Sequence, residues 1–294
     1  MRVFKVLSIV LLVAAMPVAA DNASEPASAG SSYVPASPGA PLWSGPRAVL
    51  YDNGSFVTHP GGGAGGADES QLQTALGMGT YGFGHQLSAG NRIADQFTIP
   101  AGETWDITNI TFFAYQTGAS TTSTITGVNV QITDAMPPGG SVVFGDQSTN
   151  IMSSTAWANT YRTLDTASGD TARAIMASVT DVVVSLGAGT YWIDWQADGS
   201  LASGPWAPPV TILGQTTTGD GLQYTGAWAP VLDVGGQGFP FIVEGTIQGS
   251  GGGGGGGGGT GAAAEPIPTM SNTGIVILVL AFIGIAAVLI RRRM

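Results

Sequence analysis

Apolar and polar residues alternate through the middle of this chain, which predicts strands rather than helices. In residues 125–133, Ile125, Val128, Val130 and Ile132 form an alternating ladder that ends before a Pro-Pro-Gly-Gly turn. Comparable runs between turn signals occur at residues 93–99, 104–115, 141–144, 155–163, 173–186, 190–196, 210–213, 222–225 and 239–247. This spacing predicts an all-β fold, a jelly-roll-like β-sandwich of roughly ten strands.

The best helix candidate in this central domain is short. Residues 69–76 lie between glycine-rich segments, and Asp68 is a suitable N-cap for a helix that starts there. The remainder of the domain, residues 47–248, shows no long run with the 3.6-residue period of an amphipathic helix. One short helix within a β domain is therefore expected.

Two continuous apolar runs flank the domain. The first follows Arg2 and Lys5 and ends in small residues, which predicts a signal peptide over residues 1–20 with cleavage between Ala20 and Asp21. The second, residues 274–290, carries no charge and would span about 25 Å as a helix; residues 270–273 extend it enough to cross a bilayer. A buried helix is the alternative for each, but low-complexity sequence separates both runs from the domain.

Low-complexity segments connect these parts. Residues 21–46 are rich in Ala, Ser and Pro and are expected to form an extended spacer. Residues 249–264 include nine consecutive glycines and are expected to form a flexible linker. The predicted order is signal peptide, spacer, extracellular domain, linker and membrane-spanning tail.

Charge and cysteine content narrow the functions open to the domain. Residues 21–265 contain nineteen acidic residues, no lysine and four arginines, a net charge of −15. Such a domain is not expected to bind nucleic acid, because it cannot neutralise phosphates. The chain has no cysteine, so thiol catalysis and disulfides are excluded and stability must come from core burial.

An ordered motif precedes the second apolar run. It consists of Pro266, Ile267, Pro268, Thr269, Met270 and Ser271, followed by Gly274, the apolar segment and Arg291, Arg292 and Arg293. This order resembles the IPTL-CTERM tail, a relative of the PEP-CTERM sorting signals of Gram-negative bacteria. Met270 stands where Leu is typical, and Asn272-Thr273 stand where the family commonly has an aromatic residue.

The resemblance implies a pathway for the precursor. The Sec translocon and signal peptidase would act first, and the arginines would stay cytoplasmic while the domain lies outside. An exosortase-type transpeptidase would then recognise the motif, cleave near it and transfer the protein to the cell surface. The implied location is an inner-membrane-anchored precursor that becomes a surface, outer-membrane or extracellular protein. Residues 94–118 are also similar to segments of uncharacterised secreted bacterial β-sandwich proteins, a resemblance that implies no activity.

Candidate catalytic and metal-binding groups are sparse. The chain has only His59 and His85, it has no Gly-x-Ser-x-Gly motif, and the domain has only three glutamates, Glu69, Glu103 and Glu244. We therefore assign no catalytic residue and no cofactor. A structural Ca²⁺ at residues 52–54 or 165–170 remains an alternative, without a defined ligand set.

Aromatic residues are the strongest binding candidates. In residues 191–195, Tyr191 and Trp195 are expected to face one side of a strand and Trp192 the other, while Trp206 and Trp228 fall in Pro/Gly-rich loops. Exposed tryptophans beside Asp and Gln would suit a sugar ring. The favoured alternative is that the loop tryptophans fold back as lids over the domain.

These observations rank three functions. A non-enzymatic structural or adhesive surface protein is favoured, a carbohydrate- or matrix-binding module comes second, and a secreted glycoside or ester hydrolase comes third. A polysaccharide is the partner expected for the second. The sequence leaves the ligand open.

Overall fold

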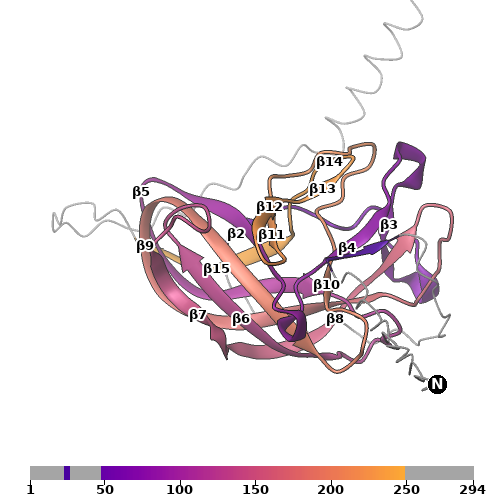
Figure 1. The fold of residues 1–294 in the computed structure, drawn as a ribbon, viewed down its shortest axis with the longest axis horizontal. Helices are drawn as coiled ribbons and strands as arrows, with labels where there is room; N and C mark the ends of the chain where they lie inside the picture. Colours follow the sequence, from indigo (N-terminus) through magenta and orange to yellow (C-terminus); the bar gives the residue numbers. More distant parts are fainter. Residues whose placement is uncertain (1–22, 27–47, 249–294) are drawn as a thin grey trace, which may run out of the picture. The chain divides into compact units, whose positions relative to one another are not determined.

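The computed structural model describes residues 23–26 and 48–248, and this part of the chain is all-β. The predicted signal peptide, most of the spacer, the glycine linker and the sorting tail lie outside the described residues. None of the described helices is long and apolar enough to cross a membrane. The strands are β1 Ser24–Pro26, β2 Ala48–Asp52, β3 Asp68–Leu72, β4 Thr80–Gly84, β5 Arg92–Ala114, β6 Ile125–Thr133, β7 Val142–Asn150, β8 Met152–Leu164, β9 Ala174–Gly199, β10 Trp206–Ala207, β11 Leu222–Tyr224, β12 Trp228–Pro230, β13 Leu232–Asp233, β14 Gly235–Gly236 and β15 Phe241–Gln248 (Figure 1).

Two long strands, β5 and β9, organise the fold. They pair antiparallel along nearly their whole length, with a register shift between Ile99 and Thr104. The early half of β5 and the late half of β9 carry β11, β12, β6 and β7, whereas their other halves carry β15, β2, β8 and β3. About ten strands thus form two halves, an arrangement consistent with a β-sandwich.

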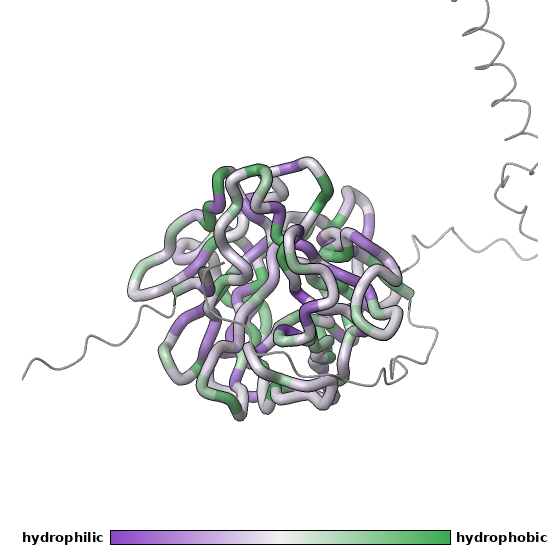
Figure 2. The backbone as a smooth tube through the Cα atoms, turned by 90° about the vertical axis from the view of Figure 1, so that its right-hand side faces the viewer, coloured by the Kyte–Doolittle hydropathy of each residue, from purple (hydrophilic) through white to green (hydrophobic). Residues whose placement is uncertain are grey.

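The core lies where these two halves face each other. Phe112 from the late half of β5 packs against Trp195 of β9 with ring centroids 4.8 Å apart, and Trp195 also contacts Phe239 and Phe241. Burial alternates along β5 from Asp95 to Ile99 and from Trp105 to Asn109, as the period-2 pattern predicts, and Figure 2 shows hydrophobic and hydrophilic residues interleaved along the backbone. Each fully buried side chain of this size stabilises the fold by about 1.5–3 kcal/mol.

A smaller sheet is built around β4, in the order β1-β4-β10. Its β1 strand comes from residues 24–26, which lie near the start of the predicted spacer. Trp206 of β10 belongs to a second buried cluster, together with Tyr81 and Tyr115. This sheet therefore joins residues 24–26 to two segments of the domain, β4 and β10, that are far apart in the sequence.

The structure corrects the short helix expected at residues 69–76. Asp68–Leu72 is strand β3, paired in parallel with β8 from Thr160 to Leu164, and only Thr74–Leu76 forms one turn of 3₁₀ helix. Pairing with β8 supplies the backbone hydrogen bonds that a local helix would otherwise make, so tertiary context overrides local propensity. Residues 210–213 are also not a strand. The amides of Val210 and Thr211 donate to the carbonyls of Gly238 and Ser55, which belong to two different segments, so no ladder with one partner forms.

Candidate ligand-binding site

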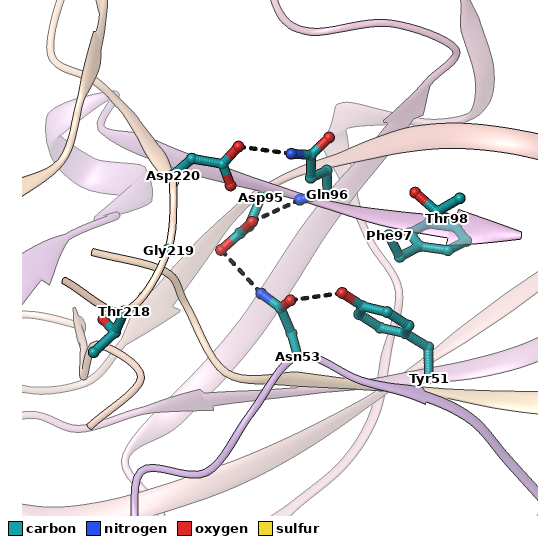
Figure 3. Close-up of a pocket in the computed structure, with 9 residues that line it drawn as sticks. All are labelled: Tyr51, Asn53, Asp95, Gln96, Phe97, Thr98, Thr218, Gly219 and Asp220. Carbon is teal, nitrogen blue, oxygen red and sulfur yellow. Dashed lines mark hydrogen bonds between the residues drawn. The ribbon is translucent and has the colours of Figure 1, made fainter. Parts of the chain in front are cut away.

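A polar pocket lies beside a free stretch of β5. One edge of β5 pairs with β9, including at residues 95–98. The other edge pairs with β11 through Ala94 and with β15 from Thr104 onward, and on that edge no strand within residues 23–26 and 48–248 pairs with residues 95–98. The end of β2 and a loop at Thr218–Asp220 approach this gap and enclose about 240 Å³ (Figure 3). We call it the seam pocket; its lining consists of Tyr51, Asn53, Asp95, Gln96, Phe97, Thr98, Thr218, Gly219 and Asp220.

Asp95 forms the base of the seam pocket. Its side chain faces inward and only 2% of the residue is exposed. It accepts hydrogen bonds from the amides of Phe239 and Gln96, both at 2.7 Å, and from Asn53 Nδ2 at 3.0 Å. Burial raises the pKa of the Asp95 carboxyl to about 6, although these hydrogen bonds oppose the rise. Both carboxyl oxygens are therefore held in place.

Asn53 links this base to an aromatic wall. Its Nδ2 also donates to the Phe239 carbonyl at 2.9 Å, and its Oδ1 accepts a hydrogen bond from the Tyr51 hydroxyl at 2.9 Å. The Tyr51 ring packs against Phe241 and Phe97, with centroids 5.8 and 6.2 Å away. Burial raises the pKa of Tyr51, so its hydroxyl remains protonated at neutral pH. The wall is thus fixed before any ligand arrives.

The rim of the pocket is more exposed and equally polar. Gln96 Nε2 donates to Asp220 Oδ2 at 2.6 Å across the opening, and Thr98 and Thr218 add hydroxyls. Carboxylates accept hydrogen bonds, and amides and hydroxyls both donate and accept them. Nowhere in the described chain do three or more His, Asp or Glu side chains gather as metal ligands. The geometry therefore suits a small neutral molecule with several hydroxyl groups.

The aromatic residues predicted as ligand-binding do not form one exposed surface. Tyr191 and Trp195 face the interior, where Tyr191 packs on Phe97 at 5.7 Å and Trp195 is 1% exposed. Trp206 is buried in β10, and its Nε1 donates to Ser203 Oγ at 3.1 Å. Trp192 faces the opposite side of β9, as expected from alternation, but it too is buried.

The β11–β12 hairpin covers Trp192. Trp192 lies in a small apolar cluster with Ala94 and Leu222, against which the half-buried Trp228 packs. Beside it, the Arg92 guanidinium lies 5.1 Å from the Trp228 ring and forms a 2.7 Å ion pair with Asp194. Burial raises the pKa of Asp194 to about 7, while Arg92 acts in the opposite direction. Trp228 is thus a lid, which matches the favoured alternative for the loop tryptophans.

The two histidines, Glu69 and Glu103 lie in settings that do not form a catalytic group. His85 is 1% exposed, and burial lowers its pKa to about 4. His59 Nδ1 lies 3.0 Å from Thr58 Oγ1. Glu69 accepts the Gly169 amide at 2.6 Å, and Glu103 accepts Trp105 Nε1 at 2.7 Å.

The two segments considered for Ca²⁺ also engage the backbone. Asp52 Oδ1 accepts the Gly54 amide at 2.9 Å, and Asp165 accepts the Ala75 amide at 3.0 Å. The first bond shapes a local turn, and the second joins residues that are 90 positions apart in the sequence. Of the two segments, only residues 52–54 reach the seam pocket, through Asn53.

Comparison with known proteins adds no assignment. No protein-family model matches this chain, and no curated protein and no solved structure matches it. Sequence reasoning singled out Asn53 but not Asp95, Gln96, Thr218 or Asp220. One signal was available: Asp95 occupies an inward position between Ile93 and Phe97, where alternation calls for an apolar residue.

Proposed function

We propose that this chain is an exported, non-enzymatic surface adhesin with a jelly-roll-like sandwich domain that binds carbohydrate in the seam pocket. The observation that carries the proposal is the lining of the pocket, which combines a fixed hydrogen-bonding base, aromatic rings and a polar rim. A sugar ring presents hydroxyls that donate and accept, together with apolar C–H faces. The lining of the seam pocket complements both.

The charge and the volume of the seam pocket limit the class of ligand further. Asp95 and Asp220 lie in the pocket, and the described domain is strongly acidic, so anionic ligands are disfavoured. The volume of about 240 Å³ is smaller than the 300–1,000 Å³ typical of drug-sized ligands. This supports recognition of one neutral sugar residue, at the end of a chain or as a branch.

The environment of Asp95 supports binding rather than hydrolysis. A general acid must reach the leaving-group oxygen of its substrate. Asp95 is almost completely buried, and both of its oxygens already accept hydrogen bonds from the protein. We assign it the role of holding Asn53 and the start of β15 in position.

Export and sorting belong to the same proposal. The support is the signal-peptide pattern at residues 1–20 and the tail that resembles IPTL-CTERM signals at residues 265–294. In this proposal an exosortase-type enzyme processes the tail, and the domain is displayed on or released from the envelope of a Gram-negative bacterium.

A glycan array with residues 21–248 tests the binding function. We expect a neutral glycan to bind, and Gln96→Ala to weaken that binding about tenfold because the rim loses a hydrogen-bonding amide. Gln215→Ala is the matched control, since Gln215 is an exposed glutamine outside the pocket. Affinities measured by titration calorimetry would decide between the variants.

Two outcomes would contradict the proposal. Absence of binding across a broad array would remove the carbohydrate function. Release of reducing sugar from a bound glycan, lost in Asp95→Asn, would replace adhesion with hydrolysis.

A further inference from the structure

Residues 23–26 occupy a groove at the edge of β4 as the short strand β1. Ser24 pairs with Phe83 and Glu25 with Gly82, and the Gly84 amide donates to the Ala23 carbonyl at 2.8 Å. Gln223 closes the end of the groove, because its Nε2 donates to the carbonyls of both Ala23 and Gly84. Both backbone and side-chain bonds thus fix the register of this segment.

Glu25 is the anchor of the segment. It is 3% exposed, and its Oε1 accepts from Thr117 Oγ1 at 2.6 Å and from Arg173 Nε at 3.0 Å. Arg173 is itself fully buried, its guanidinium lies 3.7 Å from the centre of the Tyr81 ring, and Asp170 approaches it only to 3.5 Å. A buried cation of this kind needs a close counter-charge, which Glu25 supplies.

A second buried arginine enriches the groove in positive charge. Arg162 is fully buried, and its Nε donates to the Tyr81 carbonyl at 2.7 Å. No carboxylate of the described chain lies within ion-pair distance of Arg162, and its pKa of about 10, lowered by burial, leaves it charged at neutral pH. Arg162 and Arg173 are two of the four arginines in a domain of net charge −15. Both contact Tyr81 of β4, so positive charge is concentrated beside this groove.

Gly82, which pairs with Glu25, has no room for a side chain. A Cβ atom at Gly82 would lie 2.9 Å from the Ala207 carbonyl oxygen and 2.6 Å from the Tyr115 hydroxyl. Position 82 of β4 therefore accepts only glycine. An extended segment that adds to a sheet edge gains affinity from main-chain bonds and specificity from side-chain contacts such as those of Glu25.

The bonds of the segment do not depend on its connection to the rest of the domain. Its partners all lie at or beyond Thr80, and 21 residues separate Pro26 from the start of β2. The same segment from another molecule would make the same contacts, which is why exchange of an identical element is a low-cost route to association.

We propose that the β4 groove is a binding site for the acidic segment Ala23–Pro26, and that a second copy of this chain supplies that segment. Copies would then be joined by exchanged N-terminal strands, with Glu25 of one copy paired to Arg173 of the next. This inference goes beyond the proposed glycan binding and does not require a ligand in the seam pocket.

Engineered disulfides test the exchange, since the chain has no native cysteine. Pro26 and Thr80 are paired across β1 and β4. Paired residues of antiparallel strands have Cα atoms about 4.5–5.5 Å apart, which is a spacing that a disulfide can bridge. A Pro26→Cys chain is mixed with an isotopically labelled Thr80→Cys chain, both spanning residues 21–250, which belong to one compact unit. We expect mixed-mass dimers, and Glu25→Gln in the first chain should lower their yield roughly tenfold or more.

The double variant Pro26→Cys/Thr80→Cys is the control for geometry, and circular dichroism confirms that each variant is folded. A link within single chains of the double variant, combined with no mixed dimers from the single variants, would overturn the exchange. Failure to form either link would show that the segment does not dock at β4. Mixed dimers that persist unchanged with Glu25→Gln would overturn the role of the Glu25–Arg173 pair.

Discussion

At the scale of single residues, Asp95 departs from the pattern that builds the rest of β5. Its neighbours on the inward row, Ile93 and Phe97, are buried apolar residues, and Asp95 is buried between them as a carboxyl. The hydrogen bonds from Phe239, Gln96 and Asn53 compensate for its loss of hydration. The buried Asp95 carboxyl therefore ties β5 to the end of β2 and to the segment before β15.

The raised pKa of Asp95 leads to a prediction about pH. In the unfolded chain the carboxyl has a pKa near 3.8, whereas in the folded domain it is about 6. The folded state therefore holds the proton more tightly, and the associated stability, about 3 kcal/mol, is present below pH 4 and lost as the pH rises through 6. Carbon-13 NMR titration of the Asp95 carboxyl should give a midpoint near 6.

The control for this prediction compares the pH dependence of the free energy of unfolding in the native protein and in Asp95→Asn. Burial lowers the pKa of His85 to about 4, so the contribution of His85 to stability rises with pH between 4 and 6 while that of Asp95 falls. The two contributions partly cancel in the stability of the native protein. Asp95→Asn retains His85 and lacks the Asp95 contribution. Free energies of unfolding with the same pH dependence in both proteins would contradict the assignment.

Residue contacts also explain why the seam pocket could not be read from the sequence. Asn53 and Asp95 are 42 residues apart, and Gln96 and Asp220 are 124 residues apart. Each pair is brought together by strand pairing, and neither belongs to a local motif. The sequence singled out residues 52–54 only as oxygen ligands beside a glycine, suited to a structural Ca²⁺.

At the scale of elements, strands whose sequence alternates clearly between apolar and polar residues were predictable. Strands that consist largely of polar residues were not. Residues 93–99 and 125–133 carry the period-2 pattern and lie in β5 and β6. β3 carries Asp68, Glu69 and Ser70, and it is a strand because β8 pairs with it in parallel. β7 extends to Asn150, well beyond the predicted end at residue 144, through residues that are mostly polar and exposed.

The β11–β12 hairpin gives a prediction at this scale. Trp228→Ala removes the lid over Trp192 and one of the rings over Arg92, so we expect a loss of about 2 kcal/mol in the free energy of unfolding. Urea unfolding followed by circular dichroism measures it. Trp228→Phe should restore most of the stability, and an unchanged midpoint in Trp228→Ala would show that the hairpin does not protect Trp192.

At the scale of the whole molecule, the proposed export and sorting lead to a prediction about the two apolar ends. We predict that the mature protein begins near Asp21 and lacks the apolar tail, because signal peptidase and an exosortase-type enzyme remove the two ends. N-terminal sequencing and intact mass of surface material check both. A mature protein that still contains Arg291 to Arg293 would instead indicate a permanent membrane anchor.

The position of β15 has a mechanical consequence for an adhesin. The seam pocket is bonded to Phe239, just before β15 begins, whereas Gln248 at its other end leads into the glycine run. A cell held by a bound glycan would be pulled from opposite ends of this one strand. Its hydrogen bonds to β2 and β5 run perpendicular to that pull, so they bear the force together in shear instead of opening one by one. The attachment would then yield only when the whole strand slides out.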